Sequence, residues 1–219
     1  MLDKIYLVLK DSPLFQGVSA GDFHALLDCL STKTVNYAKD EIIVLTGDPI
    51  TAVGILLSGG VRVIREDVDG RSHILVEFGS GEVFGEVFVS AGISHSPVTI
   101  QASLSSEVIF IDYQRILSTC GSACPFHSLL IANMLRLMAT KNLMLNQKLE
   151  IISKRTTREK LLCYFDLQRG AARRFTIPFN REELARYLCV DRSAMSSELS
   201  RMQAAGLIRY KRKNFEILG

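Results

Sequence analysis

Residues 180–208, NREELARYLCVDRSAMSSELSRMQAAGLI, decide how the C-terminal part of this 219-residue chain folds. Asn180 can cap a first helix, with Glu183 at the third helical position to complete a capping box. Asp191 can cap a second helix, and Gly206 can end it in a left-handed conformation. The pattern therefore predicts two short helices joined by a tight turn.

The second of these helices has two unlike faces. Met195, Leu199 and Met202 recur at spacings of four and three residues, so they share one face and are expected to point inward. The outward positions are Arg192, Ser193, Ser196, Ser197, Ser200 and Arg201. Such side chains can bond base edges and phosphates in a major groove, so the helix is predicted to read DNA. The alternative is the solvated polar face that any amphipathic helix presents.

Positive charge is concentrated in the same part of the chain. Residues 1–150 hold 11 Lys and Arg against 16 Asp and Glu, a net charge of −5, whereas residues 151–219 hold 15 against 7, a net charge of +8. A basic domain that also carries a helix-turn-helix pattern is typical of phosphate contact. The shift in charge also predicts two domains rather than one.

A basic hairpin is predicted after the second helix. Residues 207–209 and 214–218 can pair as two strands. The tip carries Lys211, Arg212 and Lys213. Beside a helix-turn-helix, such a wing rests on the phosphate backbone and adds affinity and salt sensitivity but little sequence choice. Asn180 and Arg181, at the start of the first helix, are assigned to the same DNA-facing surface.

The N-terminal half alternates short β-rich runs with turns. The runs are residues 41–45, 53–57, 61–65, 73–78, 98–102 and 107–111. Gly47-Asp48, Gly59-Gly60 and Asp69-Gly70 are among the turn signals, at the spacing of an antiparallel barrel or jelly roll. The chain is therefore predicted to be α+β, with a β-barrel of the double-stranded β-helix or jelly-roll type at its N-terminus.

A long helix is predicted from Pro125 to about residue 153, because this run contains no further glycine or proline. Alternating steps of four and three residues form a heptad pattern: Ile131, Leu135, Met138, Asn142, Leu145, Leu149 and Ile152. One asparagine at an a position favours parallel pairing of two helices, since each buried amide can bond its twin. We therefore expect a parallel homodimer; packing of the pattern within one chain is the alternative. A second stripe is expected to pack on the barrel: Leu130, Met134, Leu137 and Met144.

Membrane insertion, secretion and a disulfide framework are not predicted. No apolar run approaches the roughly 18 residues of a membrane span, and residues 1–10 mix charge into their apolar positions, so a cytoplasmic location is expected. The five cysteines are odd in number. Cys120 and Cys124 could form a redox pair or bind a metal, but no second pair at ligand spacing accompanies them, so no metal site is assigned.

The order of barrel, long helix and winged helix-turn-helix resembles the catabolite-activator, or CRP/FNR, family of bacterial regulators over nearly the full length. The matching segments are residues 47–48 (GD), 60–63 (GVRV), 69–70 (DG), 81–86 (GEVFGE), 183–185 (ELA) and 190–196 (VDRSAMS). The resemblance implies that Arg192, Ser193 and Ser197 reach base edges. Members that bind cyclic AMP have glutamate and arginine in place of the two serines, so a different operator is expected.

The barrel departs from the cyclic-AMP-binding members of this family at one place. Those members follow Gly-Glu, after about ten residues, with an Arg-Ser pair that holds the cyclic phosphate. Here Gly85 and Glu86 are present, but the later positions are Ser96 and Pro97. Losing the charge-assisted bond costs on the order of 1.5 to 3 kcal/mol, so cyclic AMP is disfavoured. An unknown small molecule is expected instead, or an empty pocket, bounded by these residues: Gly85, Glu86, Ser96, Lys141 and Asn142.

Two further signals used in this family find little support in the residues. An iron-sulfur cluster would need several cysteines near the N-terminus, where only Cys29 occurs. Haem would need an axial ligand, for which His73 and His95 are candidates, but a lone histidine is more often a surface or core residue. The cofactor is therefore unknown, with cyclic AMP, an iron-sulfur cluster and haem each disfavoured.

An enzyme is the first alternative, since similar barrels house metal-dependent catalysis. The four histidines offer no pair at ligand spacing, and neither Gly-x-Ser-x-Gly nor a phosphate-binding Gly-x-x-x-x-Gly-Lys motif occurs, so no catalytic residue is assigned. The second alternative is a regulatory protein with a cyclic-nucleotide-type barrel that controls a protein partner. The basic wing and Arg192 favour DNA.

The sequence thus predicts a dimeric, sequence-specific transcription regulator under the control of a small-molecule or redox signal. Its parts are a sensing barrel (residues 1–122), a dimerisation helix (123–153) and a winged helix-turn-helix (154–219). For half-sites one helical turn apart, the operator should be an inverted repeat of double-stranded DNA. The family resemblance also implies RNA polymerase as a partner.

Overall fold

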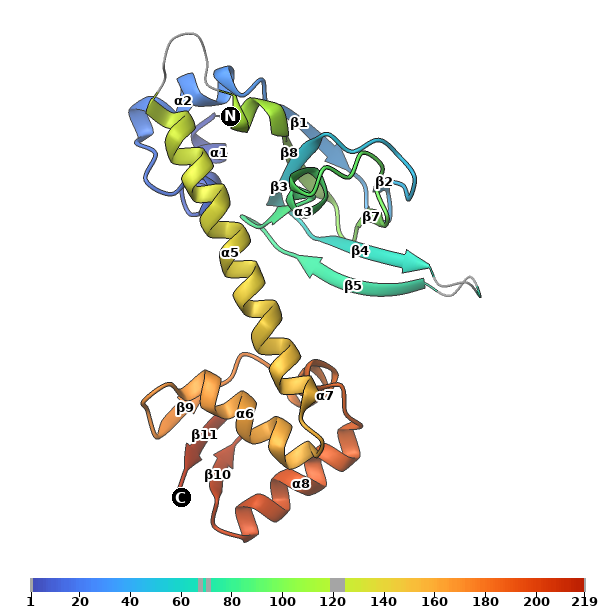
Figure 1. Cartoon of the computed structure of the whole chain (residues 1–219), viewed down its shortest axis with the longest axis vertical. Coiled ribbons are helices and arrows are strands. Elements are labelled where there is room, and N and C mark those ends of the chain that lie inside the picture. The colour runs from blue at the N-terminus through green and yellow to red at the C-terminus, as the bar shows by residue number, and fades with distance from the viewer. Residues whose placement is uncertain (1, 67–68, 70–71, 119–124, 219) are drawn as a thin grey trace. The chain divides into compact units, whose positions relative to one another are not determined.

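The computed structural model describes residues 2–66, 69, 72–118 and 125–218. The chain divides into two compact units, Met1–Ala139 and Thr140–Gly219. Helix α5 (Pro125–Ser153) begins at the predicted proline and continues through the boundary between the units (Figure 1). In the described part of the chain, no helix has both the length and the apolar content needed to cross a membrane.

Two four-stranded antiparallel sheets form most of the first unit (Figure 1). Their strand orders are β1-β8-β3-β6 and β2-β7-β4-β5. The strands are β1 (Lys33–Tyr37), β2 (Ile42–Val44), β3 (Ala52–Ser58), β4 (Val61–Glu66), β5 (Ser72–Phe78), β6 (Val83–Phe84), β7 (Thr99–Ala102) and β8 (Ser106–Asp112). The predicted jelly-roll architecture is confirmed, and each of the six predicted runs overlaps a strand.

Strands β1 and β6 were not predicted. Strand β1, KTVNY, is an edge strand with mostly exposed side chains, so it lacks a strong apolar alternation. Strand β6 has only two residues and exists because Phe84 pairs with Gly54 of β3. A Cβ atom on Gly54 would lie 2.3 Å from Cζ of Phe84, so glycine is required for the ring to cover this strand.

Helices cover one end of the sheets and share their apolar core. They are α1 (Leu2–Leu9), the 3-10 turn η1 (Pro13–Phe15), α2 (Ala20–Cys29), α3 (Glu86–Ser90), α4 (Tyr113–Leu117) and the first part of α5. Leu130, Met134 and Leu137 of α5 are buried in a core that includes Ile55 of β3. The predicted second stripe is therefore confirmed for these three residues. It is wrong for Met144, which is 62% exposed and lies beyond the part of α5 that belongs to the first unit.

The second unit is a winged helix-turn-helix (Figure 1). Its elements are α6 (Thr157–Arg169), β9 (Arg174–Thr176), α7 (Arg181–Leu188), α8 (Arg192–Ala204), β10 (Ile208–Lys211) and β11 (Asn214–Ile217). The three strands form an antiparallel sheet in the order β10-β11-β9. Its core joins Leu161 and Phe165 of α6 to Leu184 of α7, Leu199 of α8 and Phe215 of β11, which ties all the layers of the unit together.

Candidate nucleic-acid interface and effector pocket

The first helix of the helix-turn-helix is fixed at its start by reciprocal side-chain bonds. Oδ1 of Asn180 accepts hydrogen bonds from the backbone N–H groups of Glu182 and Glu183, both at 2.9 Å. Oε2 of Glu183 accepts from the backbone N–H of Asn180 at 2.6 Å, which completes the predicted capping box. The carbonyl oxygen of the Asn180 side chain is thus engaged in capping α7.

The turn and the start of α8 are fixed in a similar way. Cys189 ends α7 with φ 51°, a left-handed conformation that reverses the chain. Oδ1 of Asp191 accepts from the backbone N–H of Ala194 at 2.8 Å and from the hydroxyl of Ser193 at 2.5 Å. The Ser193 hydroxyl, followed by the Ala194 N–H, lowers the pKa of the exposed Asp191 carboxyl. Ser193 must exchange this partner before its hydroxyl can donate to a base.

Helix α8 has the two faces that its sequence predicts. Met195, Leu199 and Met202 are fully buried. Of the predicted outward positions, five are exposed: Arg192, Ser193, Ser197, Ser200 and Arg201. Ser196 is half-buried, and its hydroxyl donates to the carbonyl of Arg192 at 2.9 Å. The face offered to a ligand therefore centres on Arg192, Ser197 and Arg201.

A groove of about 590 Å³ separates this face from the start of α6. It is lined by Thr156, Thr157, Arg158, Ser193, Ala194, Ser197, Glu198 and Arg201. Nε of Arg158 lies 2.5 Å from Oε1 of Glu198, which brings an α6 arginine onto the α8 face. Arg158 was not among the predicted DNA-binding residues, because this contact joins residues 40 positions apart and leaves no local pattern.

The wing is held against the first helix by contacts that its sequence does not show. Arg181 Nη2 donates to the carbonyl of Arg212 at 3.4 Å, and the Arg181 guanidinium lies over the rings of Tyr210 and Phe215. Nζ of Lys213 donates to the carbonyl of Pro178 at 2.5 Å. Burial lowers the pKa of Arg181 from its usual value. Arg181 and Lys213 therefore brace the hairpin, and Lys211, Arg212 and Lys213 are all exposed at its tip.

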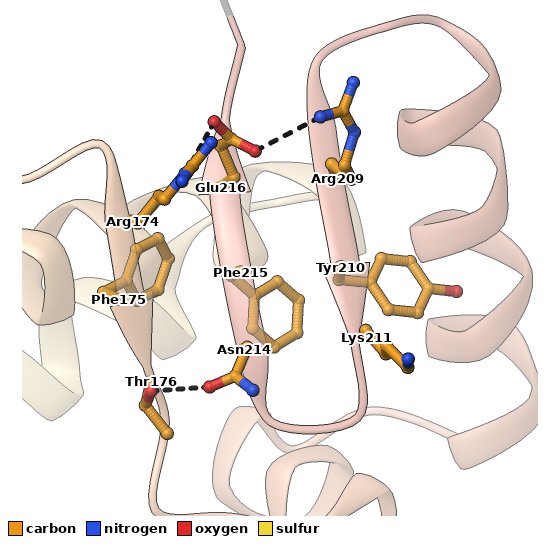
Figure 2. A pocket seen from close by; sticks show the side chains of 9 residues that line it. All are labelled: Arg174, Phe175, Thr176, Arg209, Tyr210, Lys211, Asn214, Phe215 and Glu216. Atoms are coloured by element: carbon orange, nitrogen blue, oxygen red, sulfur yellow. Dashed lines mark hydrogen bonds and ion pairs between the residues drawn. The ribbon is translucent and has the colours of Figure 1, made fainter.

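A hollow of about 640 Å³ lies on the sheet of β9, β10 and β11 (Figure 2). Glu216 bonds two arginines from the neighbouring strands: Oε1 lies 3.0 Å from Nε of Arg174, and Oε2 lies 3.5 Å from Nη1 of Arg209. Lower in the view, Thr176 donates to Asn214 at 2.7 Å. These ion pairs and this hydrogen bond link the side chains of neighbouring strands across the sheet. The carboxylate of Glu216 also offsets part of the positive charge of this face.

One of the predicted effector residues of the jelly roll lines a cavity. The jelly roll holds a cavity of about 110 Å³. It is lined by Val44, Pro49, Ile50, Thr51, Ala52, Phe84, Gly85, Ile100 and Phe110. Gly85 lines this cavity, whereas Glu86 and Ser96 are not among its lining residues. Both are buried, and the Ser96 hydroxyl donates to the carbonyl of Val98 at 2.7 Å.

The remaining predicted residues lie on α5. Lys141 and Asn142 belong to the second compact unit, and Oδ1 of Asn142 accepts from Nδ2 of Asn146 at 2.8 Å. Among the heptad positions, Leu135, Leu145 and Leu149 are 67%, 58% and 50% exposed. Asn142 is exposed, and the half-buried positions are Ile131, Met138 and Ile152. Most of the heptad surface of α5 is therefore uncovered in the single chain.

No metal site is found in the described ranges, where no group of three or more His, Cys, Asp and Glu side chains could hold an ion. Cys120 and Cys124, the predicted candidate pair, lie outside the described residues. The haem candidate His95 is exposed, and its Nδ1 lies 3.0 Å from the hydroxyl of Ser94. His73 lies on strand β5.

Two protein-family models match the chain in the same order as its two units. A cyclic nucleotide-binding domain matches residues 34–122, and a Crp-like helix-turn-helix domain matches residues 159–219. The CRP-like cAMP-activated global transcriptional regulator of Mycobacterium tuberculosis is 25% identical over 212 residues, which cover 94% of this chain and 92% of that protein. The CRP-like protein Clp of Xanthomonas campestris is 24% identical, over 79% of this chain and 78% of Clp.

Solved structures share the fold. The structure of the c-di-GMP responsive global regulator CLP from Xanthomonas campestris matches with a TM-score of 0.57 and 22% identity, over 92% of this chain and all of that one. The structure of DNR from Pseudomonas aeruginosa matches with a TM-score of 0.51 and 22% identity, over 97% of this chain and 93% of that one. Both likenesses extend over jelly roll, long helix and helix-turn-helix.

Proposed function

Because the chain belongs to the CRP/FNR family of bacterial transcription regulators, we propose that it binds inverted-repeat operator DNA as a parallel homodimer and responds to a signal at its jelly roll. Members of this family regulate transcription rather than catalyse reactions. The observation that carries the proposal is the α8 face, where Arg192, Ser197 and Arg201 are exposed above a fully buried row of apolar residues.

The proposed division of labour on DNA follows from side-chain length and exposure. Arg192 stands at the first position of α8 and can reach two acceptors of a guanine in the major groove. Ser197 can contact a base or phosphate one turn further on. Lys211 and Arg212 at the wing tip contact phosphates, which adds affinity on any sequence. We assign a supporting role to Asn180 and Arg181, because their side chains hold the helix start and the wing.

The proposed dimer rests on the uncovered heptad surface of α5. Leu135, Leu145 and Leu149 expose half or more of their surface, which is unfavourable for leucine in water and is relieved when two helices pair. Asn142 lies between them at an a position, where bonding to its twin would select the parallel register. Two chains paired in this way would present two copies of α8 to an inverted repeat. RNA polymerase as a partner stays a prediction from family resemblance.

We propose that the effector is not cyclic AMP. The names of two relatives specify different signals, cyclic AMP for one and c-di-GMP for the other, so family membership does not decide the ligand. Here the cavity of about 110 Å³ is well below the roughly 300 to 1,000 Å³ of typical ligand sites, and its lining is mostly apolar. Ser96 and Pro97 replace the expected phosphate-binding pair. A smaller ligand fits this cavity better, and a redox signal stays a prediction.

The test of the function is selection of DNA fragments from a random pool by the purified protein, followed by sequencing. An inverted repeat with half-site centres about 10 base pairs apart, or a multiple of that spacing, is the expected outcome. Enrichment of a single unrepeated site would contradict the dimeric arrangement. Enrichment of no sequence, with no binding in dilute buffer, would contradict the proposed function itself.

A further inference from the structure

An acidic residue lies on the face proposed to approach DNA. Glu198 belongs to α8 and lines the groove together with Ser197 and Arg201. A carboxylate here repels phosphates, so its presence needs a physical reason. Its side chain is only 12% exposed, whereas the side chains of its two partners, Arg158 and Arg201, are 46% and 72% exposed. Glu198 is therefore covered by the cations and does not itself form the outer surface.

Each carboxylate oxygen of Glu198 faces one guanidinium. Oε1 lies 2.5 Å from Nε of Arg158, and Oε2 lies 3.5 Å from Nη1 of Arg201. Arginine has five N–H donors, so a bond through Nε leaves the four donors of both terminal nitrogens for another acceptor. Those terminal nitrogens form a planar fork that matches two oxygens of a phosphate.

The groove provides space and further donors beside that fork. Its volume is about 590 Å³, and its lining includes Thr157 and Ser197, which carry hydroxyl groups. Glu198 with two arginines leaves a net charge of +1 at this point, so an approaching phosphate still meets positive charge. A long arginine side chain loses rotamer freedom when it binds a ligand. Because the Nε contact already restricts Arg158 in the free protein, less side-chain entropy is lost when DNA binds.

We propose that Glu198 is a positioning residue for DNA binding: it holds Arg158 through Nε so that the terminal nitrogens of this arginine bind one backbone phosphate in the groove between α6 and α8. The ligand is a phosphodiester, and the contact is independent of base sequence. This inference rests on the proposed function.

Two variants of equal charge separate positioning from repulsion. Glu198→Gln retains an oxygen that can accept from Nε, whereas Glu198→Ala retains none, and both remove the same negative charge. Binding of the full-length protein to a fluorescein-labelled duplex of arbitrary sequence is measured by anisotropy over a range of salt concentrations. Glu198→Gln should bind about two- to tenfold more tightly than Glu198→Ala, the range expected for the net contribution of one hydrogen bond. In an Arg158→Ala background, the two variants should bind equally.

The salt dependence gives a second readout on Arg158 itself. Arg158→Ala should lower the slope of log affinity against log salt by about one, the value for one lost phosphate contact. Arg169→Ala is the matched control, because Arg169 ends the same helix and its Nε lies 2.7 Å from Oδ1 of Asp166. This control should leave the slope unchanged. Thermal unfolding of each variant checks that the folded fraction is equal.

The outcomes separate the positioning role of Glu198 from DNA binding itself. If wild type binds the duplex but Glu198→Gln and Glu198→Ala bind equally, the positioning role is wrong while the proposed function stands. A difference that persists in the Arg158→Ala background would also overturn the inference, because it would not act through Arg158. A wild-type protein that ignores the duplex in dilute buffer overturns the proposed function and this inference together.

Discussion

The guanidinium of Arg181 lies 4.6 Å from the ring centroid of Tyr210. This contact joins α7, the first helix of the helix-turn-helix, to β10, the first strand of the wing. The same guanidinium lies 5.2 Å from the ring centroid of Phe215 and donates to the carbonyl of Arg212. Arg181 therefore fixes the position of the wing relative to the reading helices within this domain.

Replacing Arg181 with alanine should loosen the wing. We expect the free energy of unfolding to fall by about 1 kcal/mol, the size of a partly buried cation–π contact, and binding to weaken on every DNA sequence alike. Urea unfolding and anisotropy measure the two effects. Arg186→Ala is the control, since Arg186 is an exposed arginine of the same helix. Equal behaviour of the two variants would show that Arg181 is not a brace.

Replacing Arg192 with alanine should remove selectivity between operators. Arg192 is exposed at the start of α8, and a bidentate contact to guanine is worth about 1 to 3 kcal/mol of discrimination. The measurement is the ratio of affinities for a selected operator and a scrambled duplex. An unchanged ratio in the variant would place the reading face elsewhere.

Neutralising the wing tip should weaken binding without changing sequence preference. Lys211 and Arg212 are both exposed. If each contacts one phosphate, the double alanine variant should lower the slope of log affinity against log salt by about two. The operator-to-scrambled ratio should stay the same. A changed ratio with an unchanged slope is the result that this assignment does not allow.

A charge on the heptad surface should separate the proposed dimer. Leu145 is 58% exposed and occupies a d position, so glutamate there would be buried between paired helices at high cost. Leu145→Glu should sediment as a monomer, and its operator affinity should fall at least tenfold. Leu143→Glu is the control, because Leu143 is 63% exposed on the same helix but outside the heptad pattern. Sedimentation of both variants as dimers would contradict pairing through this surface.

Acid should destabilise the helix-turn-helix partly through Asp191. The Ser193 hydroxyl and the Ala194 N–H lower the pKa of this carboxyl in the folded protein. A group with a lowered folded pKa stabilises the fold above its unfolded pKa, about 3.9, and this stabilisation is lost as pH falls through the lower folded value.

Asp191→Asn provides the matched comparison, because asparagine caps equally well but does not titrate. Thermal unfolding from neutral pH to about pH 3 should show wild type losing stability relative to this variant in the acid range only. Parallel curves for the two proteins would mean that the cap does not contribute to the pH dependence.

Much of the architecture could be predicted from the sequence because its signals are local. Asn180 and Glu183 are three residues apart, and the capping box they predict is present. Pro125 begins the long helix, a position that proline favours. Gly206 follows α8 with φ 72°, the left-handed conformation that glycine adopts readily. Strand β6 was missed because its two residues carry no pattern of their own and are ordered by pairing with β3.

The candidate site was predicted in outline but not in its internal contacts. Arg192 and Arg201 follow from the helical periodicity of α8. The bracing role of Arg181 and the contact between Arg158 and Glu198 do not, since each joins side chains separated by some 30 to 40 residues. The burial of Ser96 likewise depends on how two turns of the jelly roll meet, since its backbone bonds Gly47 and Asp48.

The sequence by itself thus determined the order of domains, the two faces of α8 and the concentration of positive charge, because periodicity, caps and charge are properties of neighbouring residues. Only the tertiary structure decided which arginines brace the wing and which face outward, where Glu198 bonds its two cations, and how little space remains beside Gly85. Those outcomes depend on distances between residues far apart along the chain, and such distances exist only after the apolar cores have packed.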